Sequence, residues 1–440
     1  MYNQETNTFE GNLCLKAKIR RKIRSSLIYL RNNGLQKFLT IVALLILYVF
    51  FVIAGRNFFT FDTFSLILRN SYFIGFLAIG VTFVIITGGI DLSIGSLSLF
   101  SAMVGGVMIN NFQTPMWLVI LIVIFTATLG GIISGVLISY FHLPPFIATL
   151  GMLMVTKGLS GIVSKSQTIY YPTITDTQYG WFRVLFNATQ SNFPSGFIIL
   201  LIFTIISIIV LRKTIIGRYV FALGSNEEAA RLSGIKTKKW KIIAYTIAGF
   251  FCGLGGLAFA ASYSSISPGA GQGYEFDAIA AVVIGGTSLS GGVGSIIGTI
   301  IGVYIMSVLK VGLPSVGVEQ FFQYFTIGIV VIIAVLIDVY RIKMSDKVKK
   351  IDPKKEKLEI LENNIEDLRI KISHMYNKQS YEDIEKVIKE QPLIKEDEQI
   401  MRIIKKIKDT GFSISEFTKL KAYINIDDGQ KYGETISKNR

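Results

Sequence analysis

The sequence feature that most constrains this chain is a polar break inside a hydrophobic stretch. Residues 86–96 read Ile-Thr-Gly-Gly-Ile-Asp-Leu-Ser-Ile-Gly-Ser and interrupt about forty-five residues of nearly continuous apolar sequence. In hydrocarbon, a broken backbone and an ionisable group are tolerated only where protein or a water-filled cavity satisfies them. The break therefore predicts a polar path across a membrane, and its candidate residues are Thr87, Gly88, Gly89, Asp91 and Ser93.

The charged residues divide the chain into three parts. Charged residues make up 17% of the chain, below the roughly one quarter that is usual in soluble domains. The last hundred residues hold 23 Lys and Arg and 19 Asp and Glu, whereas the first 340 hold 22 and 11. We therefore expect an all-α polytopic membrane domain over residues 38–340, a basic cytoplasmic arm over 1–37 and a charged, helical cytoplasmic tail over 341–440.

The hydrophobic segments predict ten transmembrane helices. About 20 apolar residues cross the hydrocarbon core as a helix. Lys and Arg gather in residues 1–37, in the loop 212–241 and after residue 340, so the positive-inside rule places both termini and that loop in the cytoplasm. The eighth span is short and interrupted by glycine, but without it the basic tail would face outward. The expected spans are 38–54, 64–87, 92–110, 117–140, 145–163, 196–211, 242–262, 275–290, 293–311 and 320–340.

The polar break has a second copy. Residues Gly88–Gly95 align without a gap on Gly285–Gly292, and Ser288 takes the place of Asp91. Paired glycine-interrupted segments are typical of the central site of a transporter. The missing second acid argues against two coupled carboxylates and favours a shared glycine hinge, while the relative orientation of the copies stays open. The second copy adds the candidate path residues Gly285, Gly286, Thr287, Ser288 and Ser290.

Two interpretations of Asp91 are compatible. Its carboxylate can accept backbone N–H groups and open a helix at Leu92. Alternatively, it faces the path and contacts hydroxyl groups of a solute. The acidic residues Glu275, Asp277 and Glu319 flank outer ends of spans, where we expect water around them, with lining of a solute entrance as the alternative.

Glycines four residues apart place small residues on one helical face and predict close helix packing in lipid. The pairs are Gly131/Gly135, Gly249/Gly253, Gly294/Gly298 and Gly298/Gly302.

Several site types lack their sequence signature. The two cysteines and two histidines lie far apart in the sequence, which favours neither a disulfide framework nor a metal site. The chain has no Gly-Lys dipeptide and hence no phosphate-binding loop, so it is not expected to be an ATPase or another enzyme. The net charge of +15 has a membrane explanation and does not call for nucleic acid.

A short helix in the cytoplasmic loop predicts a protein partner. Within residues 224–235, an Asn can cap a helix, two Glu suit its first turn, two Ala form a small face and a Gly ends it. Such a helix has little core to bury by itself and needs a surface to dock on. The residues concerned are Asn226, Glu227, Glu228, Ala229, Ala230 and Gly234.

These motifs together resemble a known family. Glu228-Ala-Ala-x-x-x-Gly234 is similar to the coupling-helix motif of ABC importer permeases, although it lacks the Ile-x-Leu-Pro ending of some classes. With the segments 86–96, 274–281 and 285–294, the chain resembles the ribose/galactose permease family over about residues 40–340, most closely the galactose/methyl-galactoside permeases. The tail exceeds the usual length of the family, so the resemblance assigns it no role.

The resemblance implies the permease subunit of an ABC importer that carries a monosaccharide across the cytoplasmic (inner) membrane. It implies a homodimer, an extracytoplasmic sugar-binding protein and a cytoplasmic ATPase with two nucleotide-binding modules, which holds the ATP and Mg, so this chain needs no cofactor of its own. Two alternatives remain. One is a permease of the same family for a nucleoside, an autoinducer or a branched-chain amino acid. The other is a secondary transporter or channel that works without an ATPase.

Overall fold

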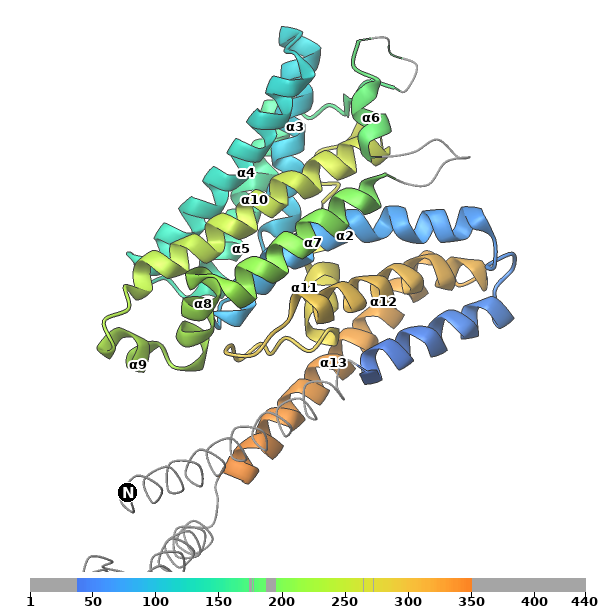
Figure 1. Cartoon of the computed structure of the whole chain (residues 1–440). Helices are drawn as coiled ribbons and strands as arrows, with labels where there is room; N and C mark the ends of the chain where they lie inside the picture. Colours follow the sequence, from blue (N-terminus) through green and yellow to red (C-terminus); the bar gives the residue numbers. More distant parts are fainter. Residues whose placement is uncertain are drawn as a thin grey trace, which may run out of the picture. The chain divides into compact units, whose positions relative to one another are not determined.

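The computed structural model describes residues 38–173, 176, 178–186, 195–263, 265–271 and 273–349, without the side chains of 337, 338 and 341–349. The chain divides into two compact units, Met1–Tyr340 and Arg341–Arg440. Every described helix except the last turns of α13 lies within the first unit (Figure 1). The predicted basic arm lies outside the described residues, and so does nearly all of the predicted helical tail.

The described part of the chain is almost entirely helical, which confirms the all-α membrane fold. An unlabelled helix, Phe38–Ala54, comes first. The helices that follow are α2 (Phe61–Ile86), α3 (Ile94–Phe112), α4 (Met116–Ser139), α5 (Pro145–Val163), α6 (Trp181–Phe186), α7 (Gly196–Lys213), α8 (Ile215–Ser225), α9 (Glu227–Leu232), α10 (Thr237–Tyr263), α11 (Tyr274–Ile284), α12 (Ile296–Ser315) and α13 (Gln320–Lys349). The strands β1 (Ile169–Tyr170) and β2 (Ser265–Ile266) form one short antiparallel pair.

Seven of these helices are long and apolar enough to cross a membrane: α2, α3, α4, α5, α7, α10 and α12. The helix Phe38–Ala54 and the apolar part of α13, Gln320–Leu336, are slightly shorter. The predicted count of ten spans is therefore not confirmed, although a helix covers most of each predicted segment except the eighth.

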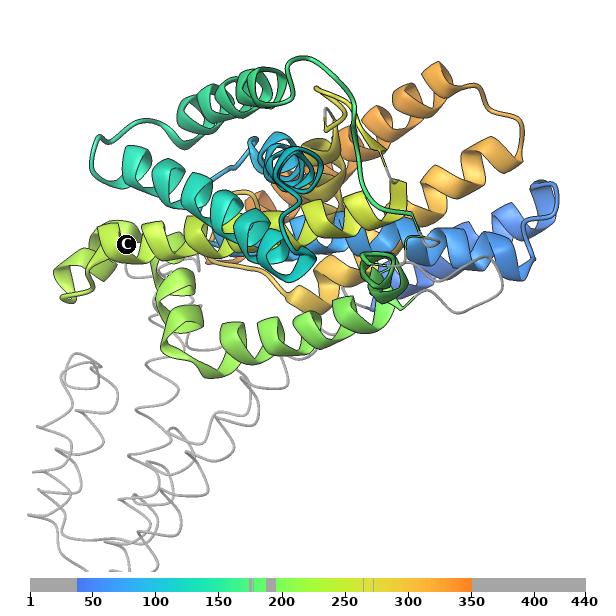
Figure 2. The ribbon, with the colours of Figure 1, turned by 90° about the horizontal axis from the view of Figure 1, so that it is seen from above.

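Helix α10 lies in the middle of the membrane unit and packs against α4, α2 and α3 (Figure 2). The α4–α10 contact is made through small residues: a Cβ placed on Gly131 would lie 2.9 Å from the Cα of Gly249, and one on Gly253 would lie 2.8 Å from the Cα of Ile124. Larger side chains at these positions would force the helices apart, so the prediction of close packing through Gly131 and Gly249 is confirmed.

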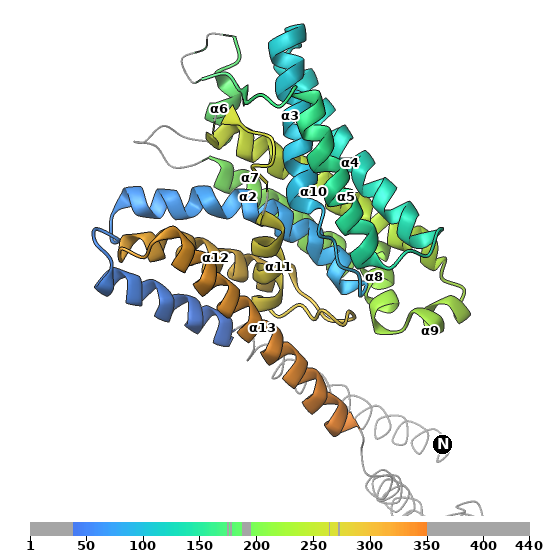
Figure 3. The same cartoon turned by 180° about the vertical axis from the view of Figure 1, so that it is seen from behind.

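The eighth predicted span, 275–290, is interrupted by glycine as the sequence indicates, and its helix ends at Ile284. Helix α11 has 11 residues, about 16 Å of helix against a hydrocarbon core of about 30 Å. It ends because Gly285 is its C-cap and Gly286 has a φ of +90°, a conformation that costs glycine little. The helix lies beside α12 (Figure 3), and Gly302 of α12 approaches it so closely that a Cβ there would collide with the carbonyl of Ala281.

Candidate functional site

The first polar break separates α2 from α3. Asp91 is only 1% exposed, and its Oδ1 accepts hydrogen bonds from the N–H of Ser93 at 2.9 Å and from the Oγ of Ser93 at 2.6 Å. Helix α3 begins at Ile94, not at Leu92 as expected, and Ser93 is its N-cap. The predicted helix start is two residues early because the carboxylate binds Ser93 in a turn that precedes the helix.

Two neighbouring helices satisfy the broken backbone. The carbonyl of Ile90 accepts hydrogen bonds from the Tyr245 hydroxyl of α10 and from the Thr149 hydroxyl of α5, both at 3.3 Å. A buried carbonyl that has left its helix needs such donors. Neither Tyr245 nor Thr149 is among the path residues that the sequence predicts. The only sequence signal was a tyrosine in an apolar span, which requires a polar partner when it is buried.

The second break, between α11 and α12, repeats the local geometry of the first. The Oγ of Ser288 accepts the N–H of Ser290 at 3.3 Å, just as Asp91 accepts the N–H of Ser93. These positions correspond in the gapless alignment of the two copies. The ends of the preceding helices do not follow that alignment. Two residues after α2 comes Gly88, with a φ of +80°, and two residues after α11 comes Gly286, with a φ of +90°. In the alignment, however, Gly88 corresponds to Gly285.

The two breaks touch each other. The N–H of Gly292 donates a hydrogen bond to the carbonyl of Ile86 at 2.9 Å. A Cβ placed on Gly291 would lie 2.8 Å from the backbone nitrogen of Gly88, and one on Gly88 would lie 3.8 Å from the carbonyl of Ser290. The structure thus brings the two predicted copies together. Gly88 and Ser290, one from each copy, are exposed at this contact.

A third segment, the end of α8, packs on both breaks. A Cβ on Gly224 would collide with the carbonyl oxygen of Ile86 and with the backbone nitrogen of Gly292. A Cβ on Gly292 would lie 2.9 Å from the Oγ of Ser225. We call this contact the three-segment junction, and its residues are Ile86–Gly88, Gly224–Ser225 and Ser290–Gly292.

Helix α9 follows the junction directly. It contains six residues, and the Oδ1 of its N-cap Asn226 accepts the N–H of Ala229 at 2.9 Å, as the sequence predicts. Gly234 has a φ of +82° and follows its end. The expected helix 224–235 is shorter, because its first two residues complete α8, a helix that the sequence pattern did not indicate.

Every residue of α9 except Ala230 is exposed. Glu227, Glu228, Ala229 and Leu232 are exposed, and Leu232 retains 80% of its accessible surface, while Ala230 is buried against the protein. Two ion pairs hold the helix: Glu228 with Arg231 at 2.9 Å and Glu227 with Lys241 of α10 at 2.7 Å.

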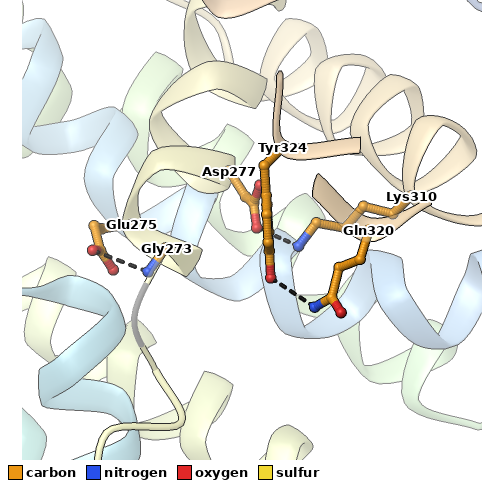
Figure 4. A network of polar contacts seen from close by, with 6 residues as sticks. All are labelled: Gly273, Glu275, Asp277, Lys310, Gln320 and Tyr324. Atoms are coloured by element: carbon orange, nitrogen blue, oxygen red, sulfur yellow. Dashed lines mark hydrogen bonds and ion pairs between the residues drawn. The ribbon is translucent and has the colours of Figure 1, made fainter. Parts of the chain in front are cut away.

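The expectation that Glu275 and Asp277 lie in water is wrong. Glu275 is 2% exposed because the start of α11 packs against Gly95 in the first turn of α3, and Asp277 is 6% exposed on the side of α11 that packs against α12. Asp277 forms an ion pair with Lys310 of α12, and the Lys310 ammonium lies 4.8 Å from the centre of the Tyr274 ring. Glu275 points to another side of α11 (Figure 4). Glu319 is exposed, as expected.

The chain has clear relatives among known proteins. Residues 63–335 match the family described as "Branched-chain amino acid transport system / permease component". The ribose import permease protein RbsC of Escherichia coli K12 is 35% identical over 311 residues, which cover 70% of this chain and 96% of RbsC. RbsC of Bacillus subtilis is 41% identical over 273 residues, covering 62% of this chain and 83% of that protein.

A third relative is the galactose/methyl galactoside import permease protein MglC of Escherichia coli K12. It is 32% identical over 338 residues, which cover 72% of this chain and 96% of MglC. Its identity is lower than that of the two ribose permeases, so these relatives support the wider ribose/galactose group and do not favour galactose over ribose.

Proposed function

Because this chain belongs to the family of permease components of branched-chain amino acid transport systems, we propose that it is the membrane permease of an ABC importer for a monosaccharide. The names of its relatives support a sugar as cargo, since they are import permeases for ribose, for fructose and for galactose or methyl galactoside. The chain itself carries out no covalent chemistry in this proposal.

The observation that carries the proposal is the three-segment junction. Helix α9 presents an exposed face to a partner, and the residues just before it, Gly224 and Ser225, pack on both polar breaks. A displacement of α9 by an ATPase subunit therefore reaches both breaks through backbone contacts. The predicted path residues at the breaks then change their exposure from one side of the membrane to the other.

The proposed partners follow from this arrangement. A cytoplasmic ATPase with two nucleotide-binding modules, which holds the ATP and Mg, docks on α9. An extracytoplasmic sugar-binding protein delivers the cargo at the opposite side. Both termini and α9 lie in the cytoplasm, in keeping with the basic residues of the loop 212–241.

The exposed face of α5 supports a homodimer with the path along this helix. Lys157 is exposed in the middle of α5, and Gly151 and Gly158 on the same face have open space around them. A charge inside a membrane span rarely faces lipid and usually faces a bundle interior or a water-filled cavity. A second copy of the chain packed against α5 would place Lys157 in a bundle interior beside a water-filled path.

ATP-driven uptake in vesicles tests the proposed function. The chain is produced with the ATPase and binding protein encoded beside it, and uptake of radiolabelled ribose, galactose and fructose is measured with and without internal ATP. We expect uptake of at least one sugar that requires ATP and both partners. Uptake by the chain alone, driven by an ion gradient, would instead support a secondary transporter.

A further inference from the structure

The first turns of α3 and α11 meet at one carboxylate. Gly95 is the second residue of α3 and Glu275 is the second residue of α11. A Cβ on Gly95 would overlap the Oε2 of Glu275 and would lie 3.1 Å from the backbone nitrogen of that residue. Each helix N-terminus carries a partial positive charge of about one half, so the carboxylate of Glu275 lies where two such charges converge.

This carboxylate is only half satisfied within the described part of the chain. Its Oε1 accepts the N–H of Gly273 at 3.2 Å, whereas Oε2 is buried and has no hydrogen-bond partner among the described residues. Glu275 as a whole is 2% exposed. A buried carboxylate oxygen without a donor is costly, which indicates that a donor arrives at some stage of the working cycle.

Polar groups of α3 and α5 lie close to this carboxylate. Next to Gly95, the Oγ of Ser96 accepts a hydrogen bond from the Thr156 hydroxyl of α5 at 2.8 Å and donates one to the carbonyl of Ser93 at 3.0 Å. The following residue of α5, Lys157, lies near the loop before α11: its Cε would be 3.6 Å from a Cβ placed on Gly269. Polar side chains from the first break, from α3 and from α5 therefore lie close together near the start of α11.

We propose that Glu275 is a solute-recognition residue, whose Oε2 accepts a hydroxyl group of a neutral polyhydroxyl solute when the path opens beside the first turns of α3 and α11. This proposal rests on the proposed function and specifies the chemistry of its path. Bare helix N-termini attract anions. Here the negative charge of the Glu275 carboxylate already compensates the partial positive charges at the N-termini of α3 and α11. The site therefore favours hydroxyl donors and repels carboxylates and phosphates.

Asp277 is also buried, but it is not assigned a role in solute recognition. It lies two residues further along α11, but its carboxylate is paired with Lys310. The same helix thus carries one carboxylate with a partner on α12 and one with an oxygen facing the start of α3.

Cysteine accessibility tests the assignment in the complete importer. In a background with Cys14→Ser and Cys252→Ala, Glu275→Cys is treated with a membrane-impermeant methanethiosulfonate reagent, at rest and during ATP turnover. Ala258→Cys, buried in α10, is the negative control, and Gln178→Cys, exposed between β1 and α6, is the positive control. We expect the Glu275→Cys variant to be labelled during turnover, and more slowly when the transported sugar is present in excess. An absence of labelling at position 275 in both conditions, or labelling that the sugar does not slow, overturns the assignment.

Glu275→Gln provides an independent test that keeps the shape of the side chain. Loss of a hydrogen bond to a charged group should slow sugar uptake about tenfold or more, while the amount of the protein in the membrane stays near that of the parent. Unchanged uptake overturns the assignment while the proposed function stands. If the parent itself shows no ATP-driven sugar uptake, the proposed function fails, and this assignment fails with it.

Discussion

The N–H of Gly292 donates a hydrogen bond of 2.9 Å to the carbonyl of Ile86, and this contact joins two polar breaks that lie far apart in the sequence. Gly224 packs against the same two backbone groups. The breaks and the residues before α9 therefore form one contact, and a substitution at any of the three glycine-rich segments should affect the other two.

Gly224→Ala should uncouple ATP hydrolysis from transport. The added Cβ would collide with the Ile86 carbonyl and the Gly292 nitrogen, and overpacking of this kind costs about 1–3 kcal/mol. We expect at least a tenfold loss of ATP-driven uptake, measured in vesicles, with the ATPase still bound to the complex. Gly328→Ala in α13, where nothing lies within 4 Å of the added atom, is the matched control and should transport normally.

Gly234→Pro should abolish ATP-driven uptake without preventing membrane insertion. Gly234 has a φ of +82° and donates its N–H to the carbonyl of Arg231 at 3.0 Å, whereas proline fixes φ near −65° and has no N–H. The docking helix α9 should therefore lose its end. Gly234→Asn, which tolerates the left-handed conformation, should retain most of the uptake. Normal transport by the proline variant would show that the end of α9 does not matter for coupling.

Asp91→Asn and Asp91→Ala separate a structural role from a charge-dependent one. The asparagine keeps an oxygen that accepts the Ser93 N–H and hydroxyl, whereas alanine loses both hydrogen bonds and should destabilise the fold by about 1–3 kcal/mol. We expect thermal unfolding in detergent to show a lower midpoint for the alanine variant alone. Full uptake by the asparagine variant would rule out a role for the charge in transport.

The ion pair between Asp277 and Lys310 should contribute to stability. Lys310→Met leaves the buried carboxylate of Asp277 without its partner, which costs about 3–5 kcal/mol. Asp277→Asn leaves Lys310, whose side chain is 24% exposed and can reach water, so it should lower the unfolding midpoint less. The double variant should recover part of the loss. If the loss of stability in the double variant equals the sum of the losses in the two single variants, the two residues do not interact.

Disulfide cross-linking tests the homodimer proposed along α5. In a background without Cys14 and Cys252, Gly151→Cys or Gly158→Cys should give a cross-linked dimer in native membranes after mild oxidation, because both positions lie open on the exposed face of α5. Ile202→Cys, exposed on α7, is the control and should stay monomeric. A dimer formed only by the Ile202→Cys variant would move the proposed interface to α7.

The polar break, the short helix α9 and the glycine contacts were predictable because each is a local pattern with one physical meaning. The turn that Asp91 makes with Ser93 depends on residues two positions apart, and Asn226 caps α9 from three residues away. Such short-range chemistry is present in the sequence itself. The prediction of a short helix ended by Gly234 follows from the same kind of pattern.

The burial of Glu275 and the hydrogen bonds of Ile90 could not be predicted in this way. Hydropathy depends on the composition of a segment and does not say how deeply the segment is buried in the fold. By composition, the acidic start of α11 resembles an exposed helix end, but in the structure it packs on Gly95 of α3. The donors to Ile90, Thr149 and Tyr245, lie on two other helices and are brought there only by the tertiary fold.

The contact of Gly224 with Ile86 and Gly292 is made by main-chain atoms, and this has a consequence for how such a permease can change its ATPase. Gly224 and Gly292 have no side chains through which the strength of this contact could be changed in small steps. On the proposed function, the protein is therefore adapted to a new ATPase most readily through the exposed side chains of α9. Chimeras that exchange residues 227–232 alone would then alter partner choice and leave the cargo unchanged.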